Sequence, residues 1–228
     1  MHISALIKRS YRFLLLALTF IITVFTPCLA QQDNPIYLIN IDAAIGPASH
    51  DYLQQSMREA HTLNAHLVII QLDTPGGLVS SMREMTKEIL NSNIPVVVYV
   101  SPSGSNAASA GAFIVYSAHV ASMAPGTNIG AASPISLGAD SPMPPDPNND
   151  TAVDNTTKSA APQLSTAQKK AIEDLSAYMR SLADSNNRNR ELGVEMITKG
   201  SSFSAQEALQ QKIVNFISTD IKQLIDQL

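Results

Sequence analysis

The sequence predicts one α/β domain in which parallel strands form a layer covered by helices. Short, almost wholly apolar runs, typical of buried parallel strands, alternate along the chain with segments of helical periodicity. Glycine-containing turns follow two of these runs directly. The 228 residues are 45% apolar and 15% charged, which is the balance of one ordinary globular domain.

The predicted elements follow from the spacing of the apolar residues. Strands are expected over residues 36–41, 67–72, 95–100, 120–123 and 213–217. Helices are expected over residues 47–63, 79–90, 109–117, 166–184 and 221–228, and a short helix after the capping-box sequence Ser204-Ala-Gln-Glu207. Small-residue turns or loops are expected over 73–77, 101–108 and 125–130. A run of prolines and aspartates predicts a flexible loop at about 138–165.

Composition excludes several classes of function. The formal net charge is −4 and charged residues are sparse, which argues against a nucleic-acid binder with a basic face. One cysteine can form neither a disulfide framework nor a thiolate metal site. Tryptophan is absent and aromatic residues make up 5%, so an aromatic-lined platform for sugars or bases is not expected.

The N-terminus has the pattern of a secretory signal peptide. Lys8, Arg9 and Arg12 precede the apolar run Phe13–Phe25, and the small residues Cys28 and Ala30 suit a cut after Ala30. The run is shorter than the roughly 20 residues of a membrane span, although an uncleaved anchor is the alternative. We therefore expect a signal peptide over 1–30 and an exported domain over 31–228, in a periplasm or on the outer face of the cytoplasmic membrane.

The start of the third predicted helix, directly after the loop 101–108, carries a candidate nucleophile, Ser109. Its context, Ala107-Ala-Ser-Ala-Gly111, is close to the strand–turn–helix motif G-x-S-x-G, with Ala107 in place of the first glycine. The backbone N–H of Ala110, at the start of a helix, could bind an oxyanion. The alternative is a small-residue helix packed closely against a strand.

The turn Asp73–Gly77 is a candidate for the second half of the same site. Its two glycines expose backbone N–H groups with no side chain in the way, and either a second oxyanion donor or a plain turn fits this sequence. In a parallel α/β layer the strand-to-helix loops lie on one edge. We therefore expect the turn Asp73–Gly77 and the loop Ser101–Ser109 to meet.

A serine nucleophile needs a base within about 3 Å. His119 is ten residues beyond Ser109, roughly 15 Å along a helix, and it is interpreted as a strand-edge residue. His50, His61 and His66 fall in or beside the first helix, so a Ser-His-Asp triad is poorly supported. Lysine is the other candidate, and helical periodicity alone does not choose between Lys169 and Lys170.

Four short motifs together resemble those of the NfeD family, ClpP-like membrane-associated serine proteases often encoded beside stomatin-like proteins. The motifs are Leu72-Asp-Thr-Pro-Gly-Gly77, Asn106-Ala-Ala-Ser-Ala-Gly111, Met123-Ala-Pro-Gly-Thr-Asn-Ile-Gly-Ala131 and Ala177-Tyr-Met-Arg-Ser-Leu-Ala183. The resemblance extends from about Ile36 to Ile217. It implies a ClpP/crotonase-like layered fold of repeated β-β-α and βα units.

The resemblance also implies a mechanism. The family's catalytic serine falls on Ser109 and its lysine on Lys170, eight residues before Tyr178. Oxyanion donors would be the backbone N–H groups of Gly77 and Ala110. The substrate would lie extended along a backbone stretch given by Gly76, Leu78 and Val79. The implied partner is an apolar segment of a stomatin-like membrane protein, the implied assembly is a homodimer, and neither a cofactor nor a metal is expected.

Departures from the family pattern keep other functions open. Longer members continue into a transmembrane bundle and a small β-barrel, neither of which is found before Leu228, and Asn187 and Lys212 stand where the family often has glycine. The main alternative is a catalytically silent peptide-binding or regulatory module. A signal-peptide-peptidase-like enzyme, whose lysine would have to be Lys87, and an acyl-CoA enzyme of the crotonase type are lesser alternatives.

Overall fold

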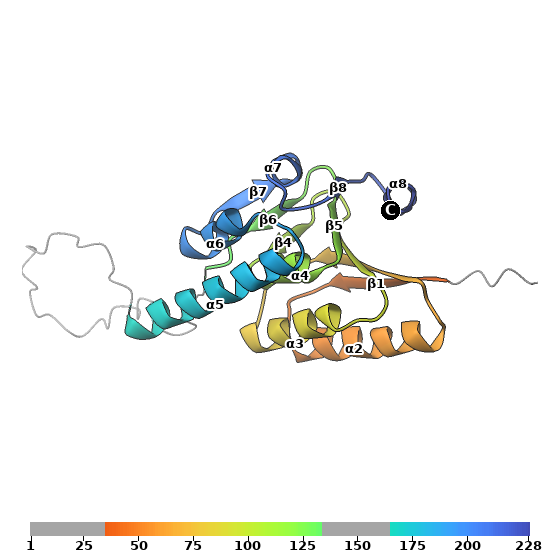
Figure 1. The fold of residues 1–228 in the computed structure, drawn as a ribbon, viewed down its shortest axis with the longest axis horizontal. Coiled ribbons are helices and arrows are strands. Elements are labelled where there is room, and N and C mark those ends of the chain that lie inside the picture. The colour runs from red at the N-terminus through yellow and green to blue at the C-terminus, as the bar shows by residue number, and fades with distance from the viewer. Residues whose placement is uncertain (1–34, 134–164) are drawn as a thin grey trace, which may run out of the picture. The chain divides into compact units, whose positions relative to one another are not determined.

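The computed structural model describes residues 35–133 and 165–228, shown as a ribbon in Figure 1. The predicted signal peptide over 1–30 lies outside the described residues. So does the predicted loop at about 138–165, except for its last residue, Ser165.

A five-stranded parallel sheet forms the centre of the described chain. Its strands, in spatial order, are β1 (Ile36–Asp42), β2 (Leu67–Asp73), β3 (Val96–Val100), β5 (Val120–Met123) and β8 (Phe216–Ile217). All four neighbouring pairs are parallel, as the apolar runs predicted. All residues of β3 are buried, because helices or neighbouring strands cover this strand on every side.

The two faces of this sheet are covered unequally. Helices α2 (Pro47–Thr62), α3 (Val79–Leu90) and α4 (Ala110–Ser117) belong to the main core with alternate strand residues such as Ile39, Ile70 and Val98. The opposite face carries α8 (Ile221–Asp226), whose Leu224 packs with Ile69, Val97 and Tyr99. Figure 1 shows α8 on one side of the sheet and α2 and α3 on the other.

A second, smaller sheet was not predicted from the sequence. It consists of β4 (Asn106–Ala108), β6 (Asn128–Gly130) and β7 (Ser202–Ser204), in the order β4-β6-β7. The first two fall inside the segments expected as loops, so those expectations were wrong at these residues. Each strand has three residues and exists through pairing with segments far away in the sequence.

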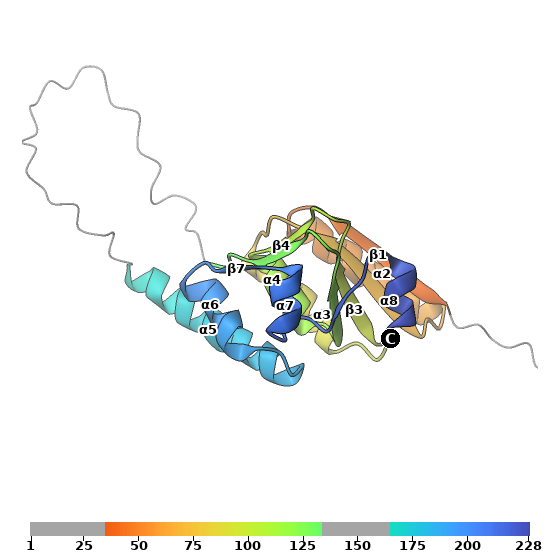
Figure 2. The ribbon, with the colours of Figure 1, turned by 90° about the horizontal axis from the view of Figure 1, so that it is seen from above.

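The remaining helices pack beside α4. Helix α5 (Thr166–Ser185) begins at Ser165, which forms a capping box with Gln168, and lies side by side with α6 (Arg190–Thr198) in Figures 1 and 2. Helix α7 (Ala205–Gln210) has the predicted capping box between Ser204 and Glu207. Helix α6 was not predicted.

The last predicted strand, over 213–217, is shorter than expected. Only Phe216 and Ile217 pair with β5, because the N–H groups of Ile213 and Val214 both donate to the carbonyl of Ala208 in the turn that ends α7. The preceding Lys212 has φ +57°, a left-handed conformation that a lysine adopts at some cost.

Candidate active site

The turn after β2 and the loop after β3 meet, as the topology predicted. The N–H of Thr74 donates to the carbonyl of Asn106 at 2.7 Å, and the N–H of Ala108 donates to the carbonyl of Thr74 at 3.1 Å. The carboxylate of Asp73 accepts a further bond from the N–H of Asn106 at 2.9 Å. Three main-chain donors thereby fix the strand that leads into Ser109.

Ser109 stands between β4 and α4 in a sparsely populated backbone conformation, with φ +52° and ψ −111°. Its N–H donates to the carbonyl of Gly130 at 2.9 Å, and its carbonyl accepts from the N–H of Ala112 at 3.1 Å. A sharp, strained strand-to-helix turn is the geometry that exposes a nucleophilic serine. Ser109 is partly exposed, and its hydroxyl has no hydrogen-bond partner among the described residues.

Glycines allow the two loops to approach closely. A Cβ atom at Gly76 would lie 2.6 Å from the Cβ of Ser109, and one at Gly111 would lie 2.7 Å from Cγ2 of Thr74. Gly76 also has φ +110°, which disfavours any other residue. The serine can therefore reach its position only because its neighbours lack side chains.

Two backbone N–H groups beside the serine are available to an oxyanion. Ile45 engages the flanks of the glycine turn, donating to the carbonyl of Gly76 and accepting from the N–H of Leu78, both at 2.8 Å. The N–H of Gly77, between them, donates to no described residue, and neither does that of Ala110 at the N-terminus of α4. Gly77, Ala110 and Ser109 line the same cavity.

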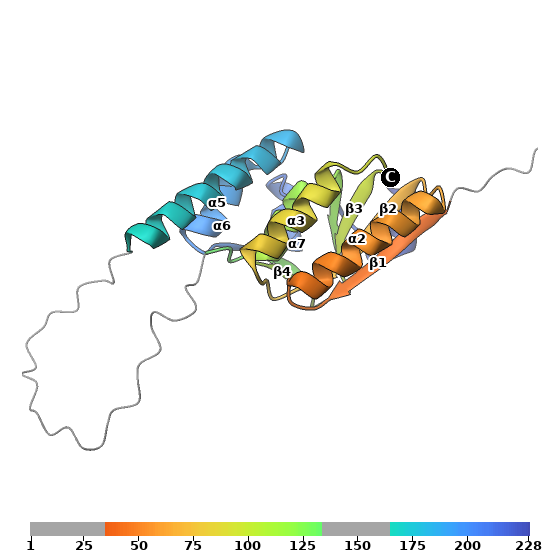
Figure 3. The ribbon, with the colours of Figure 1, turned by 90° about the horizontal axis from the view of Figure 1, so that it is seen from below.

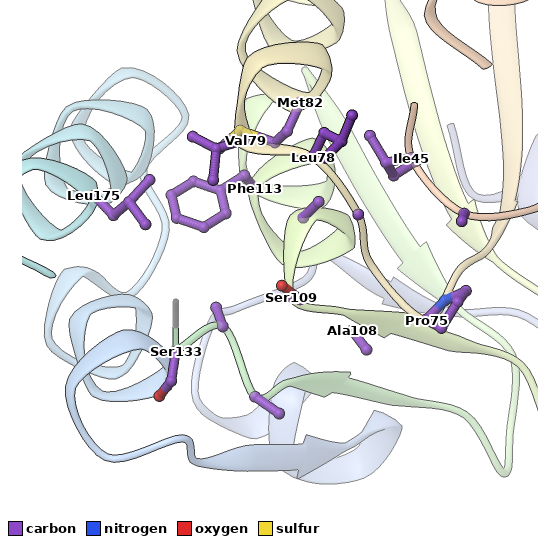
Figure 4. Close-up of a pocket in the computed structure, with 15 residues that line it drawn as sticks. Ile45, Pro75, Leu78, Val79, Met82, Ala108, Ser109, Phe113, Ser133 and Leu175 are labelled. Carbon is purple, nitrogen blue, oxygen red and sulfur yellow. The ribbon is translucent and has the colours of Figure 1, made fainter. Parts of the chain in front are cut away.

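This cavity has a volume of about 530 Å³ and a mostly apolar lining. Figure 4 shows Ser109 at its edge, with Phe113 and Leu175 facing each other on one side. Its large apolar side chains come from four separate segments and are Ile45, Leu78, Val79, Met82, Phe113 and Leu175. Residues Ala131–Ser133 complete the wall. Of these apolar side chains only Leu78 and Val79 were expected, as substrate contacts that the family resemblance implied. The rest of the wall depends on the unpredicted strand β6 and on the docking of α5.

Lys170 does not line the cavity, and no hydrogen bond or ion pair joins it to Ser109. It is exposed on the second turn of α5, beside the equally exposed Lys169. The structure thus brings together Ser109, Ala110, Gly76 and Gly77 but leaves Lys170 apart from them.

Helix α5 is held against α3 and α4 by one cluster of side chains. Arg83 of α3 forms an ion pair with Asp174 at 2.6 Å, and its guanidinium lies 4.5 Å from the centre of the Tyr178 ring. That ring stacks on Phe113 at 6.1 Å between centroids, and its hydroxyl hydrogen-bonds to Thr86. The same Phe113 lines the cavity, so this cluster couples the position of α5 to the site.

The register between these helices determines which side of α5 faces the site. Asp174 contacts Arg83 and Tyr178 contacts Thr86, so α3 and α5 run in the same direction, as Figure 3 shows. Lys170 lies one turn before Asp174 on the same side of the helix, and one turn before Arg83 lies Val79, at the cavity. Lys169 is rotated by about 100° from Lys170.

Other candidate bases lie away from the serine. His119 accepts a hydrogen bond from the N–H of Val96 at 3.1 Å beside the first residue of β5, as expected of a strand-edge residue. His50, His61 and His66 lie within or just after α2 and do not line the cavity. Lys87, exposed on α3, lies 4.0 Å from Glu84. These positions support neither a histidine triad nor a dyad with Lys87.

The far end of α4 is anchored by a buried arginine. Arg188 donates to the carbonyls of Ala118 at 2.9 Å and Ile213 at 3.0 Å. Burial lowers the pKa of Arg188 to about 10, and burial raises that of the neighbouring Tyr116. Tyr116 donates to the carbonyl of Asn189, so the helix that carries Ser109 at its start is fixed at its end as well.

Residues 35–133 and 165–228 lack two features, a membrane-spanning helix and a metal-binding cluster. No helix there combines the length and hydrophobicity that crossing a bilayer would require. No group of three or more His, Cys, Asp or Glu residues there is arranged to hold a metal ion.

Comparison with known proteins identifies the family. The family model described as NfeD1b, N-terminal domain, matches residues 35–142. The membrane-bound protease PH1510 of Pyrococcus horikoshii is 34% identical over 214 residues, which are 94% of this chain and 44% of PH1510. The chain therefore spans less than half the length of this relative.

Solved structures agree in fold. A serine-to-alanine mutant of the 1510-N membrane-bound stomatin-specific protease is 34% identical, with a TM-score of 0.71 over 85% of this chain and 84% of the other. A lysine-to-alanine mutant of 1510-N in complex with a substrate peptide, also 34% identical, has a TM-score of 0.70 over 85% and 79%. ClpP1 from Listeria monocytogenes, at 15% identity, shares the fold with a TM-score of 0.60 over 82% of this chain and 94% of ClpP1. The chain belongs to the NfeD family of ClpP-like proteases.

Proposed function

We propose that this protein is a serine endopeptidase in which Ser109 is the nucleophile and Lys170 the general base. The observation that carries the proposal is the strained turn at Ser109, which presents a hydroxyl without a partner beside two unused backbone N–H groups and an apolar cavity. That the similar 1510-N protease has been studied as a serine and a lysine mutant supports the same pair of residue types.

In this mechanism Lys170 removes the proton from the Ser109 hydroxyl as its oxygen attacks a peptide carbonyl. The N–H groups of Gly77 and Ala110 stabilise the negative charge that develops on the carbonyl oxygen. Lys170 then donates the proton to the leaving amine, which leaves an acyl-enzyme that water hydrolyses. The exposed Lys170 has to approach the serine for this, and the register of α5 with α3 supports its choice over Lys169.

The substrate is proposed to be an extended, apolar peptide. Residues Gly76–Leu78, just before α3, form a stretch that pairs with Ile45 through Gly76 and Leu78, while the N–H of Gly77 between them stays unused. A peptide lying there would add a strand, with an apolar side chain in the cavity. Leu78 and Val79, 48% and 43% exposed, would contact it.

The biological setting is part of the same proposal. The name of 1510-N as a stomatin-specific protease supports a stomatin-like membrane protein as the substrate, and the apolar cavity beside Ser109 supports cleavage at an apolar segment. The N-terminal sequence pattern supports export to the periplasm or the outer face of the cytoplasmic membrane. A homodimer remains a proposal from the family resemblance.

A second candidate function is a silent peptide-binding module. The separation between Lys170 and Ser109 favours it, because a cleft without a base in place would hold a peptide without cutting it.

Cleavage of an apolar peptide library, read by mass spectrometry, separates these candidates. We expect the wild-type protein to cut, Ser109→Ala to leave the library intact, and Ser103→Ala, at an exposed serine in the preceding loop, to cut at the wild-type rate. Binding of peptides without cleavage by folded wild-type protein would contradict the protease and support the silent module.

A further inference from the structure

The position of Asp174 raises a question about the proposed base. It lies four residues after Lys170 on α5, a spacing at which lysine and aspartate commonly form an ion pair along a helix. Such a pair stabilises the charged ammonium and holds it against the helix. A lysine that accepts a proton from serine has to be uncharged and free to turn toward the hydroxyl.

Asp174 is engaged elsewhere. Its Oδ2 lies 2.6 Å from Nη2 of Arg83, whereas no ion pair within 4.0 Å joins it to Lys170. Arg83 is itself held in place, because its guanidinium lies over the Tyr178 ring and its side chain is 35% exposed, against 69% for Asp174. A guanidinium keeps its charge at any pH at which the protein would work.

We propose that Arg83 is a positioning residue for the general base: by binding Asp174 it keeps Lys170 free of an ion pair and able to reach Ser109. This inference rests on the proposed function, because it assigns Arg83 a role through Lys170. Arg83 thereby has two roles. It docks α5 on α3 through Tyr178, and it binds the carboxylate of Asp174, which would otherwise pair with Lys170.

Among the remaining charged groups on α5 and the elements packed against it, Glu173 is the other carboxylate at ion-pair spacing from Lys170, three residues away on α5, and no ion pair within 4.0 Å joins the two. Helix α4 carries no Asp, Glu, Lys, Arg or His. Several charged groups on α3 and α6 are already in contact with other residues: Glu84 with Lys87, Glu88 with Gln54, and Glu195 with Lys199. The others on these helices and on α5 are Glu191, Arg190, Lys169, Glu173, Arg180 and Asp184, of which Arg190 and Asp184 pair with each other.

A suppressor experiment on the full chain tests the proposal. Arg83→Met removes the charge but keeps an apolar stem against Tyr178, and Arg83→Gln serves as a second variant if the first does not fold. Each is combined with Asp174→Asn, and Asp174→Asn alone is the control. The readouts are thermal melting, kcat/KM on the library peptide that the wild type cleaves fastest, and its pH profile.

We expect Arg83→Met to lose about fivefold in kcat/KM, the factor that one exposed ion pair supplies. Its pH profile should move to higher pH, because the released Asp174 then pairs with Lys170. Asp174→Asn alone should stay within about twofold of the wild type, and Arg83→Met with Asp174→Asn should regain most of the loss and the wild-type profile.

If Arg83 only docks α5, the double variant should not recover activity, because removing both partners would be at least as harmful as removing one. A double variant that does not regain activity would overturn this inference, and so would an Arg83→Met protein with the wild-type rate and pH profile. In either case, Ser109-dependent cleavage by the wild type would still support the proposed protease. Wild-type protein that fails to cut would overturn both.

Discussion

The two halves of the proposed dyad are built in different ways. Ser109 is fixed by main-chain hydrogen bonds with Gly130 of β6 and Ala112 of α4, and it has glycine neighbours that lack side chains. Lys170 stands exposed near the start of a surface helix, and the nearest contacts that hold this helix on α3 begin one turn later at Asp174. The position of Ser109 therefore depends on the backbone, and the position of Lys170 depends on a few side chains that dock α5.

This difference indicates where the site tolerates change. In the proposed mechanism the oxyanion donors are backbone N–H groups, and the nucleophile is a side-chain hydroxyl whose position depends on the backbone turn at Ser109. The base belongs to a helix whose docking can be tuned by single side chains. Substitutions on the serine side should therefore act on stability and activity together, whereas substitution of the exposed Lys170 should act on activity alone.

The largest effect that tests this contrast is expected from Lys170→Ala. Loss of a general base lowers the rate by about 10²–10⁴-fold, and the melting temperature should not change because Lys170 is exposed. Lys169→Ala, on the same turn, should keep the wild-type rate. The combination of Lys170→Ala with Ser109→Ala should be no worse than either alone, as expected of groups that act as a unit.

Peptide cleavage and thermal melting of the wild type, the three single variants and the double variant check this prediction. A wild-type rate in Lys170→Ala would exclude the dyad, and a large loss in Lys169→Ala instead would move the base by one residue.

Gly76→Ala is expected to have a smaller effect on cleavage, together with a loss of stability. The new Cβ would lie 2.6 Å from the Cβ of Ser109, in a backbone conformation with φ +110°. We expect a loss of about 3 kcal/mol in the free energy of unfolding and about 100-fold in cleavage, because the serine is displaced. Denaturant unfolding and peptide cleavage measure the two losses.

Gly46→Ala is the matched control, because a Cβ there meets nothing within 4 Å. Equal behaviour of the two alanine variants would show that the serine side is less rigid than its contacts suggest.

The smallest effect on stability is expected at the capping box of α7, which contains neither Ser109 nor Lys170. Hydrogen bonds from the backbone and side chain of Ser204 lower the pKa of Glu207 below its usual 4.5. The stabilisation from this carboxylate is therefore present above the unfolded pKa and lost as the pH falls through the lower folded value. Glu207→Gln should melt slightly below the wild type at pH 7, and this difference should shrink as the pH falls below the unfolded pKa, with cleavage at pH 7 unchanged.

Most of the central sheet could be predicted because its strands are buried on one or both faces and read as apolar runs. Helices α2, α3, α4 and α5 began and ended within a residue or two of the predicted bounds. Strands β4, β6 and β7 could not be predicted, since runs such as Asn-Ala-Ala carry no β signal and become strands through pairing. Helix α6 was missed because Gly193 and β-branched residues weaken its pattern, whereas in the fold Gly193 permits close packing on Met179 and Tyr116.

The candidate site likewise has one part that could be predicted from the sequence and one part that could not. Ser109, Gly76, Gly77 and Ala110 were predicted together, because glycines and small residues after strands are visible in a single sequence. The apolar wall formed by Phe113, Leu175 and Met82 was not, since its members look like ordinary core residues until the helices are placed. The face of α5 that carries Lys170 followed only from its contacts with Arg83 and Thr86.

The backbone at Ser109 also has an evolutionary consequence. A conformation with φ +52° and ψ −111° is costly for serine by about 1–3 kcal/mol, and glycine adopts it freely. Selection for cleavage has to maintain that cost against the tendency of random substitution to relieve it. A lineage that stops cutting peptides gains stability by exchanging this one serine for glycine, so glycine at this position would mark descendants that kept the fold and gave up the reaction.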